Sequence, residues 1–383
     1  MTRDRLGAIA GVAESDLGVV GPDRTSLDLQ AQAAKAALEE AGLGLSDVDA
    51  VFSAGGEAWS PTMAIAEYLG ITPRWSDATN IGGSSFDAHV GHAVTAIRAG
   101  RCEVALITYG STQRSQRSRS LGRTGEIRGP AQFELIWGLP LPVGAYALAA
   151  TRHMHQYGTT AEQLAEVAVA TRAWAALNPK AYYRDPISIG DVLASPIISS
   201  PLHLLDCCLV TDGGGAVVVV SEAVAGSLRG KPVWVIGHGE AHTHLTIANM
   251  PDLTVTPAAL SGPVAMEMAG VTHADLDVVE VYDSFTITVI ETLESLGFCA
   301  PGEGGEFVSR QRTAPGGDFP LNTNGGGLSY CHPGMYGIFL LIEATRQLRG
   351  ERGEAQVPGA RLALVNGTGG VLSSCATVVL AGD

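Results

Sequence analysis

Positive charge is scarce in this sequence. Its 383 residues include 24 Lys and Arg against 39 Asp and Glu, which gives a formal net charge of −15 at pH 7. Proteins bind nucleic-acid backbones largely by neutralising phosphates with Lys and Arg, so this balance excludes a general nucleic-acid binder. Any site for a polyanion has to be local.

Long apolar runs are missing as well. No stretch approaches the roughly 18 to 20 apolar residues that span a bilayer. The first residues, MTRDRLGAIAGVAESDLG, lack the charged start, the apolar run and the small-residue cleavage site of an export signal. We therefore expect a cytoplasmic protein without a membrane segment.

Cysteine is sparse, with six residues scattered along the chain and no CxxC pair. This pattern predicts reduced thiols instead of a disulfide framework or a zinc site. Two pairs of alternating histidines, in TRHMHQYG and EAHTHL, have no third ligand nearby, so we expect no metal.

What the sequence does have is a repeat. Residues 41–51 (AGLGLSDVDAV) and 269–279 (AGVTHADLDVV) share a helix stop, a short loop and an Asp-x-Asp step into an apolar strand. A second internal similarity relates residues 96–111 to residues 341–370. With 46% hydrophobic residues and 48 glycines, the chain fits two packed halves better than one core.

Strand-like and helical segments alternate in both halves, which predicts an α/β protein with a mostly parallel sheet covered on both faces. Residues 112–200 interrupt this alternation with a Pro-rich loop and helical stretches. We expect an N-terminal half made of residues 1–111 and 201–228, a loop or lid domain at 112–200, and a C-terminal half at 229–383.

Three long stretches carry a resemblance to a known family: residues 157–221 (YGTTAEQLAEVAVATRAW to GGGAVVVVS), 281–308 (VYDSFTITVIETLESLGFCAPGEGGEFV) and 321–351 (LNTNGGGLSYCHPGMYGIFLLIEATRQLRGE). They resemble the thiolase superfamily, in the branch of sterol-carrier-protein thiolases and steroid side-chain-degrading aldolases. The resemblance implies a thiolase fold, with duplicated βαβαβαββ halves that form a five-layer α-β-α-β-α sandwich and carry an inserted loop domain.

Thiolases use two catalytic cysteines, and neither of the corresponding positions in this sequence carries a cysteine. The slot of the nucleophilic cysteine falls on Gly83, or on Ser84 or Ser85 if the alignment slips, in NIGGSSFDAHV. The later Cys-x-Gly position falls on Gly367 or Thr368 in NGTGG. Without the attacking thiolate, the acyl-enzyme step of a thiolase is not available.

The other two active-site positions of the family are occupied by groups that can move protons. Tyr282 stands in the slot that carries Asn or His, and the His-Pro turn is kept as CHPGMYG with His332. The resemblance implies an acyl-CoA retro-aldolase in which Tyr282 and Tyr330 form the acid/base pair and His332 polarises the thioester carbonyl. Which tyrosine is the base stays open, as does the orienting role of Asp283, and Tyr336 is expected to pack beneath the following helix.

The resemblance also suggests a substrate and partners. Related aldolases release propionyl-CoA from a 17-hydroxy steroid side chain and leave a 17-ketosteroid, so coenzyme A enters as part of the substrate and no other cofactor is expected. A homodimer and a small OB-fold, zinc-ribbon partner of the DUF35 type are expected by the same analogy. The arginines of QRSQRSRSLGRTGEIRG fit either coenzyme A phosphates or a plain loop or subunit contact.

Two alternatives remain open at the level of sequence. The first is a thiolase that uses a displaced cysteine, Cys331 or Cys299. The second is a non-catalytic subunit that binds acyl-CoA as a scaffold. A thiolase would consume free coenzyme A during turnover, whereas an aldolase would not.

Overall fold

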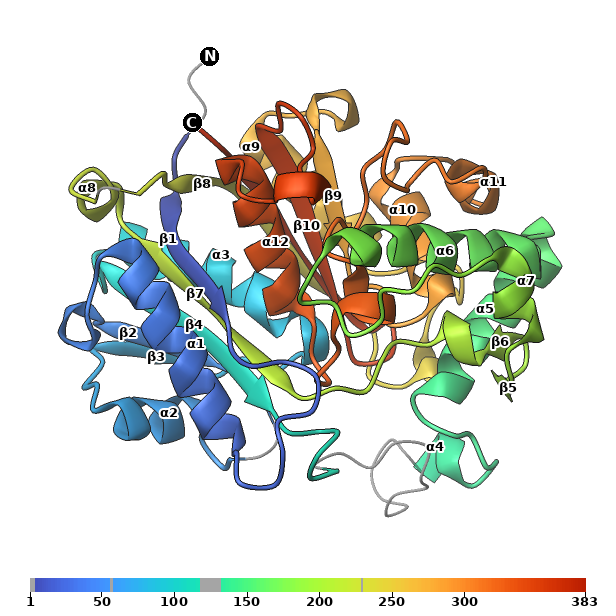
Figure 1. The fold of residues 1–383 in the computed structure, drawn as a ribbon, viewed down its shortest axis with the longest axis horizontal. Helices are drawn as coiled ribbons and strands as arrows, with labels where there is room; N and C mark the ends of the chain where they lie inside the picture. Colours follow the sequence, from blue (N-terminus) through green and yellow to red (C-terminus); the bar gives the residue numbers. More distant parts are fainter. Residues whose placement is uncertain (1–3, 56–57, 118–131, 229) are drawn as a thin grey trace.

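The computed structural model describes residues 4–55, 58–117, 132–228 and 230–383. Its centre is a nine-stranded mixed sheet (Figure 1). The prediction of a mostly parallel sheet is wrong, because five of the eight strand pairings in this sheet are antiparallel. The strands run in the order β3 (Trp75–Asp77), β2 (Ala50–Ser53), β4 (Val104–Ser111), β7 (Gly213–Val220), β1 (Gly7–Glu14), β8 (Val233–His242), β11 (Ser374–Ala381), β10 (Leu362–Gly369) and β9 (Val278–Val281). The first five strands form the N-terminal half and the last four the C-terminal half. They join where β1 pairs antiparallel with β8.

Helices cover the sheet in three layers. α3 (Ser85–Arg98) and α12 (Gly337–Arg349) contact strands of both halves and lie between them. α1 (Ser26–Ala41) and α2 (Pro61–Leu69) cover the outer face of the N-terminal half, and α9 (Ala258–Ala269) and α10 (Thr286–Leu296) that of the C-terminal half. This arrangement has the predicted order of layers, α-β-α-β-α.

Side chains that alternate along the strands point into two separate hydrophobic cores. Val218 and Val220 of β7 pack into the outer core, while Val217 and Val219 face the central helices. Both sets are fully buried, as expected for strands covered on both faces. The central layer therefore holds the two halves together.

The predicted repeat is present in three dimensions. α1 and α9 each end at a glycine in the left-handed conformation, Gly42 and Gly270. The second aspartate of each Asp-x-Asp step accepts two main-chain amides from the start of a neighbouring strand. Asp49 accepts the amides of Glu103 and Val104 at the start of β4. Asp277 accepts the amides of Arg361 and Leu362 at the start of β10. The duplicated motif thus ties each short strand to its neighbour.

The segment between the halves lies outside the large sheet. Its elements are α4 (Gln132–Leu135), α5 (Val143–Tyr157), α6 (Ala161–Leu177), α7 (Ile189–Ala194) and β5 (Ile197–Ser199), which pairs with β6 (Leu202–His203). Figure 1 shows α5 to α7 beside the C-terminal half, where α5 and α6 contact α10. Two short helices, α8 (Glu222–Ala225) and α11 (Gly304–Val308), lie outside this segment. Within the described residues no helix has the length and apolarity needed to cross a membrane.

His92 on α3 forms an ionic bridge between the halves. Its Nδ1 lies 2.5 Å from Asp77 Oδ2 of β3, and its Nε2 lies 2.9 Å from Glu240 Oε2 of β8. The hydrogen bond to Asp77 and then that to Glu240 raise the pKa of His92 to about 9. The imidazolium is thus the form that the folded protein prefers at neutral pH.

Replacing His92 by glutamine should lower the free energy of unfolding by about 1–2 kcal/mol, a value reduced for the partial exposure of the ring. Because the pKa is raised from 6.5 to about 9, the stabilisation is complete below pH 6.5 and is lost as the pH rises through about 9. Urea unfolding at pH 6 and pH 10 checks this, with exposed His155→Gln as control. A His92→Gln penalty that is as large at pH 10 as at pH 6 would contradict the bridge.

Candidate active site

Loops from both halves meet at the carboxyl end of β9. Tyr282 follows this strand directly and donates its amide to Asn366 O of β10. Residues 208–211 run alongside, and their amides bond to Ser284 O, Gly327 O and His332 O. From the N-terminal half, the Tyr109 hydroxyl at the end of β4 donates to Pro333 O over 2.6 Å. Main-chain hydrogen bonds to neighbouring segments therefore help to fix the two predicted loops.

Tyr282 and His332 form a buried pair. The Tyr282 hydroxyl lies 2.8 Å from His332 Nε2, and the two rings meet edge to face. Tyr336 stacks on His332, and its own hydroxyl donates to Asn324 Oδ1. A phenol and an imidazole at this distance can pass a proton either way, which is what general acid–base catalysis requires. Tyr336 also stacks on Phe339 of the following helix, α12.

The Tyr282 ring fills the space of the missing nucleophile. A Cβ atom added to Gly83 would lie 2.1 Å from Tyr282 Cε2 and 2.7 Å from Thr368 O, far inside van der Waals contact. No side chain, cysteine included, fits at position 83 while this ring stays in place. A side chain at position 83 and the Tyr282 ring in this position therefore exclude each other.

The second thiol position is filled in a comparable way. A Cβ atom on Gly367 would lie 2.0 Å from Asp87 Oδ2 of α3. Asp87 is fully buried, and neither of its oxygens has a partner among the described residues. Burial raises the pKa of this carboxyl group well above its usual value, which favours its neutral form. Sequence reasoning missed Asp87, although an aspartate on the buried face of a helix is a visible signal.

The structure does not bring Tyr330 to the Tyr282–His332 pair. Its hydroxyl donates to Glu14 Oε1 over 2.7 Å, and Glu14 also forms a bidentate ion pair with Arg346 of α12. Burial and then the Glu14 carboxylate raise the pKa of Tyr330 well above its usual value. Burial opposes ionisation of Glu14, but the Arg346 guanidinium holds its pKa well below the usual range. Tyr330 thus completes a buried ion pair between β1 and α12.

Replacing Tyr330 by phenylalanine should cost about 1.5–3 kcal/mol of folding stability, the value of a hydrogen bond to a charged group. Turnover of the remaining folded enzyme should stay near that of the wild type, because the Tyr282–His332 pair is untouched. Thermal unfolding and steady-state rates on the same preparation test both statements. Abolished turnover with wild-type stability would instead give Tyr330 the catalytic role that the sequence suggested.

Backbone amides of the glycine-rich turn are already bonded. Asp283 accepts the amides of Gly327 and Leu328, and the amide of Gly326 donates to Asn324 Oδ1. Burial raises the pKa of Asp283 to about 7. Asp283 therefore shapes the turn that precedes His332, and its role in orienting a tyrosine stays a prediction. These three amides are also not available as donors to a substrate oxygen.

The cysteines suggested as displaced nucleophiles are poorly suited to that role. Cys331 is fully buried, and burial raises the pKa of its thiol well above the usual value. Burial likewise raises the pKa of Cys299 to about 12. Because the thiolate is the nucleophile, both shifts disfavour the reactive form of these thiols.

One further tyrosine reaches the site from the inserted segment. Tyr146 of α5 packs on Phe285 with ring centroids 4.4 Å apart, and its hydroxyl lies 3.4 Å from Gly370 O. Burial raises its pKa to about 12. Nothing in the sequence around Tyr146 indicated that α5 contributes to the candidate active site.

The arginine-rich stretch is only partly placed. Arg119, Arg123 and Arg128 lie outside the described residues. Arg114 donates to Val210 O and lies over the Tyr182 ring. A role of these arginines in binding coenzyme A phosphates stays a prediction.

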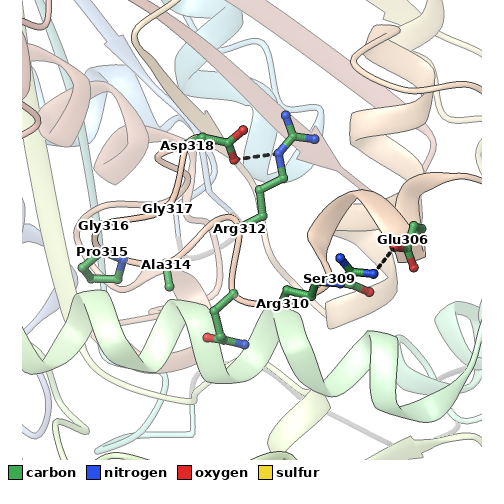
Figure 2. Close-up of a pocket in the computed structure, with 10 residues that line it drawn as sticks. Glu306, Ser309, Arg310, Arg312, Ala314, Pro315, Gly316, Gly317 and Asp318 are labelled. Carbon is green, nitrogen blue, oxygen red and sulfur yellow. Dashed lines mark hydrogen bonds and ion pairs between the residues drawn. The ribbon is translucent and has the colours of Figure 1, made fainter.

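A surface cavity of about 560 Å³ lies apart from these loops. It is lined only by residues between Glu306 and Asp318. Figure 2 shows its two arginines turned to acidic partners, Arg312 to Asp318 at 2.8 Å and Arg310 to Glu306 at 3.7 Å. None of the predicted site residues lines it, and its cations are already paired.

A duplicated sheet with central helices shared by both halves, and with a site between the β9 and His-Pro loops, defines a protein of the thiolase fold. Residues 239–382 match the family described as "Thiolase C-terminal domain-like". The human mitochondrial 3-ketoacyl-CoA thiolase shares this fold, with a TM-score of 0.72 over 99% of this chain and 100% of that one at 18% identity.

Three individual relatives indicate more closely which proteins of the thiolase fold this chain is similar to. The chain is 35% identical to "Steroid side-chain-cleaving aldolase" of Thermomonospora curvata, over 90% of both proteins. It is 36% identical to "17-hydroxy-3-oxo-4-pregnene-20-carboxyl-CoA lyase" of Mycobacterium tuberculosis, over 90% of this chain and 91% of that protein. It is 31% identical to "Acetyl-CoA acetyltransferase" of Methanothermobacter thermautotrophicus, over 95% and 96%.

A solved structure described as "Ltp2-ChsH2(DUF35) aldolase" superposes with a TM-score of 0.89 at 32% identity, over 98% of each chain. The chain belongs to the thiolase superfamily, in its sterol-carrier-protein thiolase-like branch, and its relatives support an enzyme that acts on acyl-CoA. The resemblance stated from sequence is confirmed.

Proposed function

We propose that the protein is an acyl-CoA retro-aldolase that cleaves a carbon–carbon bond without forming an acyl-enzyme. The observation that carries this proposal is the replacement of both thiol positions. The Tyr282 ring occupies the space beside Gly83, and the buried Asp87 carboxyl group occupies the space beside Gly367. We propose that proton transfer by the Tyr282–His332 pair takes the place of nucleophilic attack by a cysteine.

The cleavage itself needs only the movement of one proton. The Tyr282 hydroxyl passes its own proton to His332 Nε2 and at the same time takes the proton of the substrate's β-hydroxyl group. The bond between the α- and β-carbons then breaks, the β-carbon becomes a ketone, and the electron pair passes into the thioester as an enolate. The same pair returns the proton to the α-carbon, which gives a shortened acyl-CoA.

The proposed substrate is a 17-hydroxy C22 steroid thioester, which yields a 17-ketosteroid and propionyl-CoA. The support is the name of the Mycobacterium tuberculosis relative at 36% identity. A DUF35-type partner is proposed because the similar solved aldolase contains one. Edge strand β3, with half-exposed Trp75, offers unpaired backbone for a homodimer.

Mass spectrometry of the products tests the reaction class. The chain, with and without a DUF35-type partner, is incubated with the 17-hydroxy C22 thioester and excess free coenzyme A. An aldolase releases ketone and propionyl-CoA in equal amounts and consumes no free coenzyme A. Consumption of free thiol, or a turnover-competent thioester adduct on a cysteine, would instead support the thiolase alternative. Binding of acyl-CoA with no product under any condition would support the scaffold alternative.

A further inference from the structure

The strand that ends before Tyr282 carries a buried carboxyl group, which shares one hydroxyl with a second carboxyl group. Thr323 Oγ1 lies 2.9 Å from Oε1 of Glu280 on β9 and 2.6 Å from Oε1 of Glu343 on α12. It also lies 2.9 Å from Nε2 of Gln347. All four residues are at most 2% exposed. The mechanism proposed above gives this cluster no role.

A count of protons requires one of the two carboxyl groups to be neutral. A hydroxyl has one proton to donate and two lone pairs that accept. The Gln347 amide donates to Thr323, and its orientation is fixed because its Oε1 accepts the main-chain amide of Val357. Thr323 can therefore donate to one carboxyl group and has to accept a proton from the other. Two ionised carboxylates would leave one short oxygen–oxygen contact without a proton.

The surroundings assign this proton to Glu280. Nε of Arg352 lies 2.9 Å from both oxygens of Glu343, so Glu343 is the ionised partner. Among the described residues Glu280 forms no ion pair, and its Oε2 has no hydrogen-bond partner. Burial and then the Glu343 carboxylate raise the pKa of Glu280 well above its usual value, against a smaller opposing effect of Arg352. Tyr336 also lies within electrostatic reach of this carboxyl group.

Thr323 precedes the glycine-rich turn of the candidate active site. The next residue, Asn324, accepts the Gly326 amide with its Oδ1 over 2.8 Å. The turn then leads to His332, whose Nε2 lies 2.8 Å from the Tyr282 hydroxyl. A displacement of Thr323 would therefore shift the start of the turn that carries the imidazole.

We infer that Glu280 is a positioning residue of the active site: it holds one buried proton and, through Thr323, fixes the start of the turn that carries His332. Loss of this proton to solvent would place two carboxylates on one hydroxyl, and their repulsion would displace Thr323. Turnover should then fall at high pH although the proposed catalytic pair is intact. The inference rests on the proposed function only for this effect on turnover, because the proton and the aromatic packing can be measured without substrate.

The stability of Glu280→Gln tests the location of the proton. Glu280 ionises in the unfolded chain near its ordinary pKa of 4.5, so the wild type has to take up a proton when it folds at higher pH. This uptake weakens the fold as the pH rises, and the glutamine amide avoids it because it is neutral in both states. In urea titrations, the ratio of the unfolding constants, wild type over variant, should rise about tenfold per pH unit between about pH 5.5 and 7.5.

Glu291→Gln is the matched control for the positioning role. Glu291 of α10 is also fully buried, burial raises its pKa well above the usual value, and neither of its oxygens has a hydrogen-bond partner among the described residues. Its replacement should change the pH dependence of stability in the same direction, but no hydrogen bond links it to Thr323.

Two measurements against pH separate these variants. Near-ultraviolet circular dichroism, which reports the packing of aromatic rings, should change at high pH in the wild type and in Glu291→Gln but not in Glu280→Gln. The high-pH fall of kcat should move upwards by at least about one pH unit in Glu280→Gln only, with KM nearly unchanged.

A Glu280→Gln protein that fails to fold, or a ratio of unfolding constants that stays constant with pH, would overturn the location of the proton. Equal behaviour of Glu280→Gln and Glu291→Gln in both pH profiles would overturn the positioning role and leave the proposed reaction in place. If the unfolding and dichroism results are as expected but the wild type cleaves no thioester, the positioning role stands and the proposed reaction falls.

Discussion

Replacing Tyr282 by phenylalanine should lower the turnover of a β-hydroxyacyl-CoA by a factor of roughly 10² to 10⁴, the usual contribution of general acid–base catalysis. The substitution removes one oxygen and keeps the ring that fills the space beside Gly83. The hydroxyl that lies 2.8 Å from His332 Nε2 is lost, and with it the group that we propose exchanges protons with the substrate. The loss should appear in kcat, because the ring still shapes the pocket.

Steady-state kinetics and thermal unfolding of the same preparations separate this effect from misfolding. Tyr336→Phe is the matched control: it also deletes a buried hydroxyl from the same aromatic cluster, one that donates to Asn324. It should cost about 1 kcal/mol of stability and leave turnover nearly intact. A Tyr282→Phe enzyme as active as the Tyr336→Phe enzyme would remove the basis of the proposed mechanism.

Introducing a side chain at Gly83 should be the second large effect. An alanine Cβ would lie 2.1 Å from Tyr282 Cε2, so the ring has to move. Overpacking of this kind costs about 1–3 kcal/mol, and misplacing a catalytic group by about 1 Å reduces the rate by about 100-fold. Gly83→Cys should therefore lose aldol cleavage without gaining thiolase activity, although it restores the family's residue type.

Unfolding in urea and product analysis of Gly83→Ala and Gly83→Cys test this expectation. Gly190→Ala on α7 is a suitable control, because an added Cβ there meets only ordinary contacts. A Gly83→Cys protein that is as stable as the wild type and forms an acyl-enzyme would show that the Tyr282 ring yields easily. The steric account of the lost thiol would then be wrong.

Much of the site could be found from the sequence because its loops keep their motifs. Tyr282 and His332 stand in recognisable positions, and the structure brings exactly this pair of side chains within hydrogen-bond distance. Tyr330 stands two residues from His332 and was expected beside it. The chain leaves a π-helical turn at Tyr330, which sends its side chain to Glu14, 316 residues away. Proximity in sequence says little about the direction of a side chain in irregular backbone.

The sequence by itself determined the duplicated α/β architecture, the loss of both thiols and the identity of the loops that meet at the end of β9. These follow from local patterns and from residue types at fixed positions. Only the tertiary structure decided which ring fills the space beside Gly83, which hydroxyl lies next to the imidazole, and that Asp87 lies buried with no hydrogen-bond partner for its carboxyl oxygens among the described residues. Such facts depend on contacts between residues tens to hundreds of positions apart, and packing, not sequence order, sets those distances.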